Sequence, residues 1–128
     1  MSDERRIYVL VPRTVDSTKP PHKFTMTCGR MAAHVAHVVG ILARAATVDV
    51  AEENIIVLSV ASSRELSERC EALSAAGILW VDYFDVDHSF EGALLTAIAT
   101  HPVMRENADA LKDLKPWRCA CNEVSIPR

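Results

Sequence analysis

The sequence predicts a single α/β domain in which a mixed four-stranded β-sheet is sandwiched by α-helices. Two observations support this prediction. Nearly continuous runs of apolar residues alternate along the chain with amphipathic stretches of helical periodicity, which is the pattern of strands and helices in α/β domains. The chain has 128 residues, of which 49% are hydrophobic and 24% charged, and this size suffices for one core without disulfides.

The first predicted elements are a strand, a loop and a long helix. Residues 7–11 form an apolar run typical of a strand buried on both faces, and Pro12 is expected to end it. Residues 14–21 predict a loop. From Arg30 to about Val48, apolar residues recur at the spacing of an amphipathic helix. The apolar stripe of this helix comprises Met31, Val35, Val38 and Leu42.

A second strand and helix follow. Residues 54–61 predict a buried strand, after which Ser62 and Glu65 match a capping box that starts a helix. Gly77 is well placed to end that helix in a left-handed conformation. The apolar stripe of this helix comprises Leu66, Cys70 and Leu73.

Two closely spaced strands complete the predicted sheet, over residues 78–84 and 94–100. The polar turn between them is too short for a helical crossover, so at least one strand pairing is expected to be antiparallel or irregular. Beyond them, residues 104–114 predict a weak helix.

The composition also narrows the class of protein. No apolar run approaches the roughly 18–20 residues that a membrane-spanning helix needs, so no membrane partner is expected. The polar start of the chain does not resemble a signal peptide, which favours a cytoplasmic protein. The four cysteines are therefore expected to be reduced thiols. They are Cys28, Cys70, Cys119 and Cys121.

Charge is distributed unevenly along the chain, whose formal net charge is −3. Residues 1–48 carry seven Lys/Arg and three acidic residues, whereas the remainder carries seven Lys/Arg and fourteen acidic residues. The basic part could face an anionic partner, or the difference could be ordinary surface scatter. The acidic total argues against unselective nucleic-acid binding.

The start of the first helix is the most distinctive segment. Gly29 and Arg30 place a fixed cation beside the free backbone N–H groups of a helix N-terminus, which is a plausible anion site. The alternative is a helix start whose alanines pack tightly against the sheet.

The turn after the third strand is a second candidate, because ligands of open α/β sheets gather where strands end. Asp85 could act as a general base or orient a water, with Arg30 as its counter-charge or as the group that steadies an oxyanion. Ser89 could donate a hydrogen bond to a carbonyl or phosphate. The alternative for Asp85 and Ser89 is turn chemistry, since both residue types bond to nearby backbone.

His34 and His37 share a face of the first helix at a spacing of three residues. Two ligands are too few for a structural zinc site, and the Cys-x-Cys pair at 119 and 121 is tighter than the usual zinc spacing. No metal site is predicted. His37 is expected instead to be a hydrogen-bonded core or supporting group.

These segments together resemble the type-2 peptidyl-tRNA hydrolases, small α/β enzymes of archaea and eukaryotes. Val11-Pro12-Arg13-Thr14 stands where the family's first strand ends in Val-Arg-Thr/x-Asp. The helix start Gly29-Arg30-Met31-Ala32-Ala33-His34-Val35-Ala36-His37 is similar to Gly-Lys-Ile-Ala-Ala-Gln-Cys-x-His. Asp85-Val86-Asp87-His88-Ser89 matches Asp-Ala-Gly-x-Thr, and residues 97–102 match a strand ending near Gly-Pro. The similarity covers residues 6–102.

The resemblance implies hydrolysis of the ester that joins a peptidyl group, or a related aminoacyl group, to the 3′ end of tRNA, with no metal or organic cofactor. Asp85 would activate water, Arg30 would hold a phosphate or the developing oxyanion, and Ser89 would donate a hydrogen bond. His37 would support the site from behind. Arg13, Gly29, His34 and His37 are the expected binding residues.

The sequence departs from the family at several of these positions. The family's lysine is Arg30, which keeps the charge but cannot transfer a proton, and the turn's glycine is Asp87. We therefore keep a second hypothesis, a non-catalytic member of the fold that binds RNA, a nucleotide or a protein. The family-like domain spans 1–102, and 103–128 is expected to be a C-terminal extension that packs on it. The expected partners are the tRNA 3′ end and a second copy of the chain.

Overall fold

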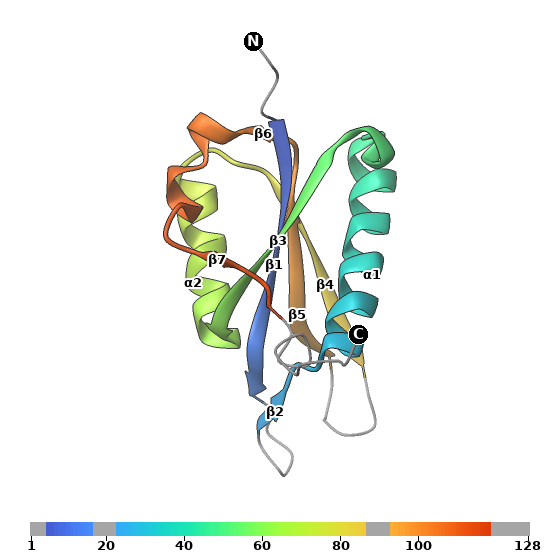
Figure 1. The fold of residues 1–128 in the computed structure, drawn as a ribbon, viewed down its shortest axis with the longest axis vertical. Coiled ribbons are helices and arrows are strands. Elements are labelled where there is room, and N and C mark those ends of the chain that lie inside the picture. Colours follow the sequence, from blue (N-terminus) through green and yellow to red (C-terminus); the bar gives the residue numbers. More distant parts are fainter. Residues whose placement is uncertain (1–4, 17–22, 87–92, 119–128) are drawn as a thin grey trace, which may run out of the picture.

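Strand β1 (Arg5–Asp16) is the central strand of a mixed sheet whose strands run in the order β4-β5-β1-β3-β7 (Figure 1). The computed structural model describes residues 5–16, 23–86 and 93–118. β1 is parallel to β3 (Asn54–Ser62) and antiparallel to β5 (Ala93–Thr100), which is antiparallel to β4 (Trp80–Val86). The predicted α/β fold with a mixed sheet is confirmed, and all four expected strands are present. The sheet is larger than expected, because the short β7 (Lys115–Pro116) adds to it beside β3.

One helix covers each face of this sheet (Figure 1). α1 (Cys28–Ala46) and α2 (Ser63–Ala75) lie within two residues of their expected starts and ends. The short strands β2 (Lys23–Thr25) and β6 (Val103–Met104) both pair with β1. Three 3₁₀ turns complete the described part: η1 (Val50–Glu52), η2 (Arg105–Asn107) and η3 (Asp109–Leu111).

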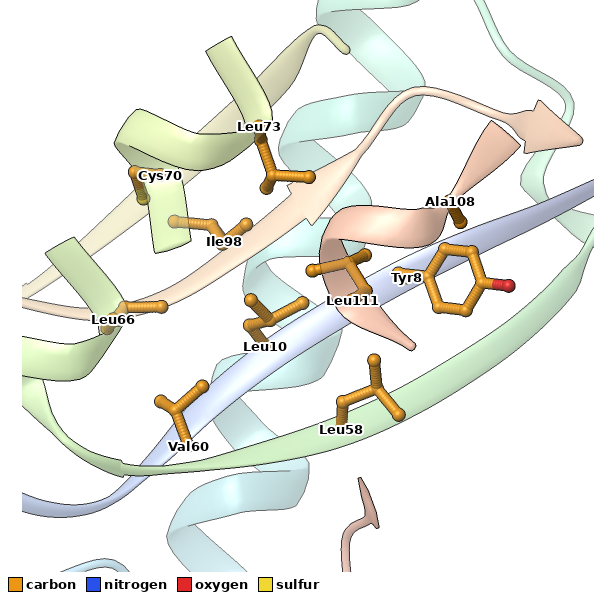
Figure 2. Packing of buried hydrophobic residues seen from close by; sticks show 10 residues of the cluster. All are labelled: Tyr8, Leu10, Leu58, Val60, Leu66, Cys70, Leu73, Ile98, Ala108 and Leu111. Atoms are coloured by element: carbon orange, nitrogen blue, oxygen red, sulfur yellow. The ribbon is translucent and has the colours of Figure 1, made fainter. Parts of the chain in front are cut away.

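Alternation along β1 divides the core into two clusters. Val9 and Val11 face α1, where they pack with the fully buried Val38 and Leu42 of that helix. Tyr8 and Leu10 point to the opposite face, because successive side chains of a strand alternate. There they meet the stripe of α2 that the sequence predicts, Leu66, Cys70 and Leu73 (Figure 2).

β1 continues past Pro12, so the prediction that this proline ends the strand is wrong. Pairing of β1 with β5 reaches only Leu10, and β2 begins to pair with β1 at Thr14, on the side opposite β3. Pro12 stands between these two pairings and pairs only with Val60 of β3. The Tyr8 N–H points toward β5, and alternation places the Pro12 nitrogen on the same side. The missing N–H therefore falls where no ladder partner needs it.

The ends of α2 follow the local signals in the sequence. The Ser62 hydroxyl accepts from the Glu65 N–H at 3.2 Å, while the Glu65 carboxylate accepts from the Ala61 N–H at 2.6 Å. At the other end, Gly77 has a φ of 76°, and the Ile78 N–H donates to the Leu73 carbonyl at 2.9 Å. This is a Schellman cap, as Gly77 predicts.

The segment after β5 does not form the helix expected over residues 104–114. It forms η2 and η3, separated at Ala108, and both Ala108 and Leu111 are buried against the α2 side of the sheet. Arg69 of α2 holds this segment by donating to the Ala110 carbonyl at 3.0 Å and by an ion pair with Asp113 at 2.6 Å. Tertiary contacts thus override a weak helical preference.

Two further findings concern the class of protein. No helix in residues 5–16, 23–86 and 93–118 is long and apolar enough to cross a membrane.

Cys28 is disulfide-bonded, so the expectation that all four cysteines are reduced thiols is wrong. Cys119 and Cys121 lie outside the described residues. Cys70 is a free, buried thiol whose pKa burial raises to about 11. The expectation rested on redox context, which carries no information about which cysteines meet in space.

Candidate functional site

The candidate site lies at one end of the sheet, where β1 and β4 finish and α1 begins (Figure 1). β4 runs in the same direction as β1, because each is antiparallel to β5. The carboxyl ends of β1, β3 and β4 consequently share one edge, the usual place for ligands in such sheets. Asp85, near the end of β4, and the first turns of α1 meet there.

At its centre is a contact between His34 and Asp85. His34 Nε2 lies 3.3 Å from Asp85 Oδ2, and the two side chains are 6% and 18% exposed. His34 is on the buried stripe of α1 together with Val38 and Leu42, at the i, i+4, i+8 positions. Helical periodicity therefore turns this imidazole toward the sheet, where Asp85 lies near the end of β4.

Tyr83 joins the two histidines and Asp85 into one cluster. Its ring is stacked on His37 at 4.8 Å between centroids, and it meets His34 edge-on at 5.5 Å. The Tyr83 hydroxyl donates a long hydrogen bond of 3.4 Å to Asp85 Oδ1. Sequence reasoning missed Tyr83. The available signal was strand alternation, which puts Tyr83 and Asp85 on the same face of β4.

Burial and neighbouring charges set the protonation of this cluster. Desolvation lowers the pKa of His34, Asp85 opposes this shift, and Arg30 and His37 add to it. A neutral imidazole can donate its Nε2–H to the Asp85 carboxylate, whereas His34 Nδ1 is buried with no hydrogen-bond partner among the described residues. Desolvation, followed by the charge of Asp85, raises the pKa of Tyr83, which keeps its hydroxyl protonated as a donor.

Arg30 contributes charge to this cluster from the first turn of α1. Its guanidinium lies over the ring of Phe24, 4.9 Å from the centroid, and its charge acts on His34. The backbone N–H of Arg30 is not free, because the Thr27 hydroxyl caps it at 3.2 Å. The charges of Arg30 and Asp85 therefore act on the same histidine, in opposite directions.

The alternative interpretation of the helix start does not hold. Ala32 and Ala33 are exposed, so these alanines do not pack against the sheet. Gly29 is also exposed, and an added Cβ would meet no atom within 4 Å. The surface at the start of α1 is thus open at Gly29, and a ligand could approach the backbone there.

Arg13, an expected binding residue, is occupied by the C-terminal segment. Its guanidinium lies 4.0 Å from the centre of the Trp117 ring and donates to the Arg118 carbonyl at 2.7 Å. The backbone N–H of Trp117 in turn donates to the Val57 carbonyl at 2.8 Å. The structure therefore brings Arg13 to the C-terminal segment, at Trp117 and Arg118, rather than to the His34–Asp85 contact. A local pattern could not indicate this, because residues 13 and 117 are far apart in the chain.

Three further outcomes complete the comparison with the sequence. Ser89 and Asp87 lie outside the described residues. Within the described residues no three His, Cys, Asp or Glu side chains are arranged to hold a metal ion. Thr96 is the extra residue of a bulge in β5, opposite Tyr83 and Phe84, and its buried hydroxyl has no hydrogen-bond partner in the described part.

Comparisons with known proteins add no assignment. No protein-family profile matches the chain, and no curated protein matches it.

Proposed function

We propose that this protein hydrolyses the ester bond of peptidyl-tRNA, or of a related aminoacyl ester, without a metal. The observation that carries the proposal is the His34–Asp85 contact of 3.3 Å at the carboxyl edge of the sheet, with the Arg30 charge beside it. A mostly buried carboxylate held by two donors, next to a fixed cation, is the arrangement that water activation and oxyanion stabilisation require.

In the proposed reaction, a water molecule attacks the carbonyl carbon of the ester and gives its proton to Asp85. The carbonyl oxygen becomes an oxyanion, which Arg30 stabilises. The tetrahedral intermediate then collapses, the bond to the ribose 3′ oxygen breaks, and that oxygen takes the proton back from Asp85. Neutral His34 and Tyr83 orient the carboxylate throughout, because each donates to a different oxygen of Asp85.

We further propose that the chain is a divergent member of the type-2 peptidyl-tRNA hydrolases. Two features support this assignment. The strand–helix–strand–helix–strand–strand order agrees with the resemblance over 6–102, and a helix lies on each side of a mixed sheet. Arg30 and Asp85, which match the family's functional lysine and aspartate, belong to the same end of the fold. The 3′ end of tRNA is the proposed partner.

The test is single-turnover hydrolysis of an N-acetylated aminoacyl-tRNA by the purified protein. We expect Asp85→Asn and Arg30→Ala each to lower the rate by about 100-fold or more, since each removes a group that acts in the transition state. Asp82→Asn is the matched control for Asp85, because Asp82 lies on the same strand but on the opposite face. Arg44→Ala is the control for Arg30, since it removes an exposed cation near the other end of α1.

One observation favours the alternative, a non-catalytic binding module. Both oxygens of Asp85 already accept from side chains, and the Arg30 guanidinium rests on Phe24, so the cluster could be a purely structural network. The same experiment separates the two functions. No hydrolysis above the buffer rate by the folded wild-type protein would contradict the hydrolase, and tRNA binding that Arg30→Ala weakens would then support the module.

A further inference from the structure

A concave site lies on the opposite face of the sheet from the His34–Asp85 contact. It is a cavity of about 760 Å³ between the α2 side of β1 and β3 and the segment that runs from η2 to β7. This volume is within the range of roughly 300–1,000 Å³ that small-molecule sites occupy. This cavity is therefore not at the candidate catalytic cluster, and it needs a separate explanation.

The floor of the cavity is apolar. It is formed by Tyr8 and by aliphatic side chains of β3 and the C-terminal segment, namely Ile56, Leu58, Leu111 and Leu114. The Tyr8 ring lies between Leu58 and Ala108, with its hydroxyl directed away from the cluster (Figure 2). Such a floor suits an apolar body, and the hydroxyl adds one hydrogen-bond donor.

The rim is charged, with an excess of cations. Arg6, Arg105 and Lys112 line it together with the acidic residues Glu106 and Asp109. In the described part of the chain, neither Arg6 nor Lys112 forms an ion pair, so both can turn toward a bound anion. This local excess of one positive charge contrasts with the acidic protein as a whole, and the two carboxylates would repel a polyanion.

We propose that this cavity binds a small amphipathic anion, a molecule with an apolar body and a single carboxylate or similar group. The body lies on the Tyr8–Leu58–Leu111 floor, and the anionic group meets Arg6 and Lys112 at the rim. A single negative charge matches the balance of three cations and two acids. The proposal does not depend on the hydrolase, because the site uses the other face of the sheet and other residues.

The test is a titration of the full-length protein with octanoate, followed by backbone amide shifts in NMR spectra. We expect saturable binding at one site, with shifts concentrated in residues 6–8, 56–58 and 105–116. The double variant Arg6→Gln/Lys112→Gln should weaken binding by about tenfold or more, since it removes two charge-assisted contacts. Octyltrimethylammonium, which has the same tail and the opposite charge, should bind far more weakly.

A matched double variant removes the same charge elsewhere. Arg44→Gln/Arg64→Gln alters two exposed arginines, one on each helix and neither on the cavity, and should bind octanoate like the wild type. Absence of saturable shifts would overturn the proposal. Equal binding of the cationic analogue, or equal loss in both double variants, would also overturn it. None of these outcomes affects the proposed hydrolase activity, because that proposal is tested separately with Asp85→Asn and Arg30→Ala.

Discussion

The two faces of the sheet bury different kinds of side chain. Under α2, the buried cluster is built mainly of aliphatic residues, such as Leu10, Leu73 and Ile98. Under α1, apolar residues share the interior with His34, whose Nδ1 has no partner among the described residues and whose Nε2 meets Asp85. Burial of a polar group without a full set of hydrogen bonds costs stability. The difference indicates that the α1 face, unlike the α2 core, keeps a buried polar group at a cost in stability.

The largest expected effect concerns buried apolar side chains, which occur on both faces of the sheet. Leu73→Ala on α2 and Leu42→Ala on α1 should each lower the free energy of unfolding by about 2–5 kcal/mol, because both side chains are fully buried. Leu79→Ala, at an exposed leucine, should change it by less than about 0.5 kcal/mol. Urea unfolding measures all three. If Leu42→Ala lowered the free energy of unfolding by no more than Leu79→Ala does, the apolar core on the α1 side would contribute little to stability.

The second effect is a pH dependence that arises on the α1 face. Burial holds the pKa of His34 below its ordinary value of 6.5, so the unfolded chain takes up this proton at a higher pH than the folded protein. The stability that His34 contributes is therefore present above about pH 6.5 and lost as the pH falls through this value, at up to about 1.4 kcal/mol per pH unit.

Unfolding free energies measured from about pH 7.5 to 5 should accordingly fall less steeply for His34→Asn than for the wild type. Identical slopes for the two proteins would contradict the buried, neutral imidazole.

The third effect compares how the two helices end. α2 ends beside Gly77 at a φ of 76°, whereas α1 ends at Thr47, a β-branched residue at a φ of 51°. Left-handed backbone costs an L-residue roughly 1–2 kcal/mol, so Gly77→Ala should destabilise the protein by about 1 kcal/mol, although its Cβ would meet no atom within 4 Å.

Thr47→Gly should have the opposite effect. It should raise the free energy of unfolding by about 0.5–1 kcal/mol, and the melting temperature with it. Thermal unfolding of both variants tests this. The same sign for both would show that helix-end strain does not differ between the two faces.

The smallest effect replaces the polar pair itself. In the double variant His34→Leu/Asp85→Leu, both partners become apolar, so the free energy of unfolding should stay unchanged or rise by about 1 kcal/mol. His34→Leu alone should lower it, because Asp85 then loses a donor while mostly buried. A double variant less stable than His34→Leu would mean that the pair stabilises the fold, and the division between the two faces would fail.

Much of the fold could be predicted from local patterns. The apolar runs and helical stripes predicted β3, β5, α1 and α2 to within about two residues, because one buried face imposes a period on the sequence. The Ser62–Glu65 box and Gly77 predicted both ends of α2, since caps depend on a few consecutive residues. Of the candidate site, the sequence named Arg30 and Asp85 as catalytic candidates and His34 as a binding residue, whereas it did not indicate the contact of His34 with Asp85.

The sequence by itself therefore determined the elements, their amphipathic faces and the residue types available for chemistry, because these depend on periodicity and on short-range hydrogen bonds. Only the tertiary structure decided the rest. The gap between β5 and β2 allows Pro12 inside β1, the Trp117 ring contacts the Arg13 guanidinium, and the arrangement of β4 beneath α1 brings Tyr83 to His34. Each of these depends on contacts between segments that are distant in the chain, which a local pattern does not encode.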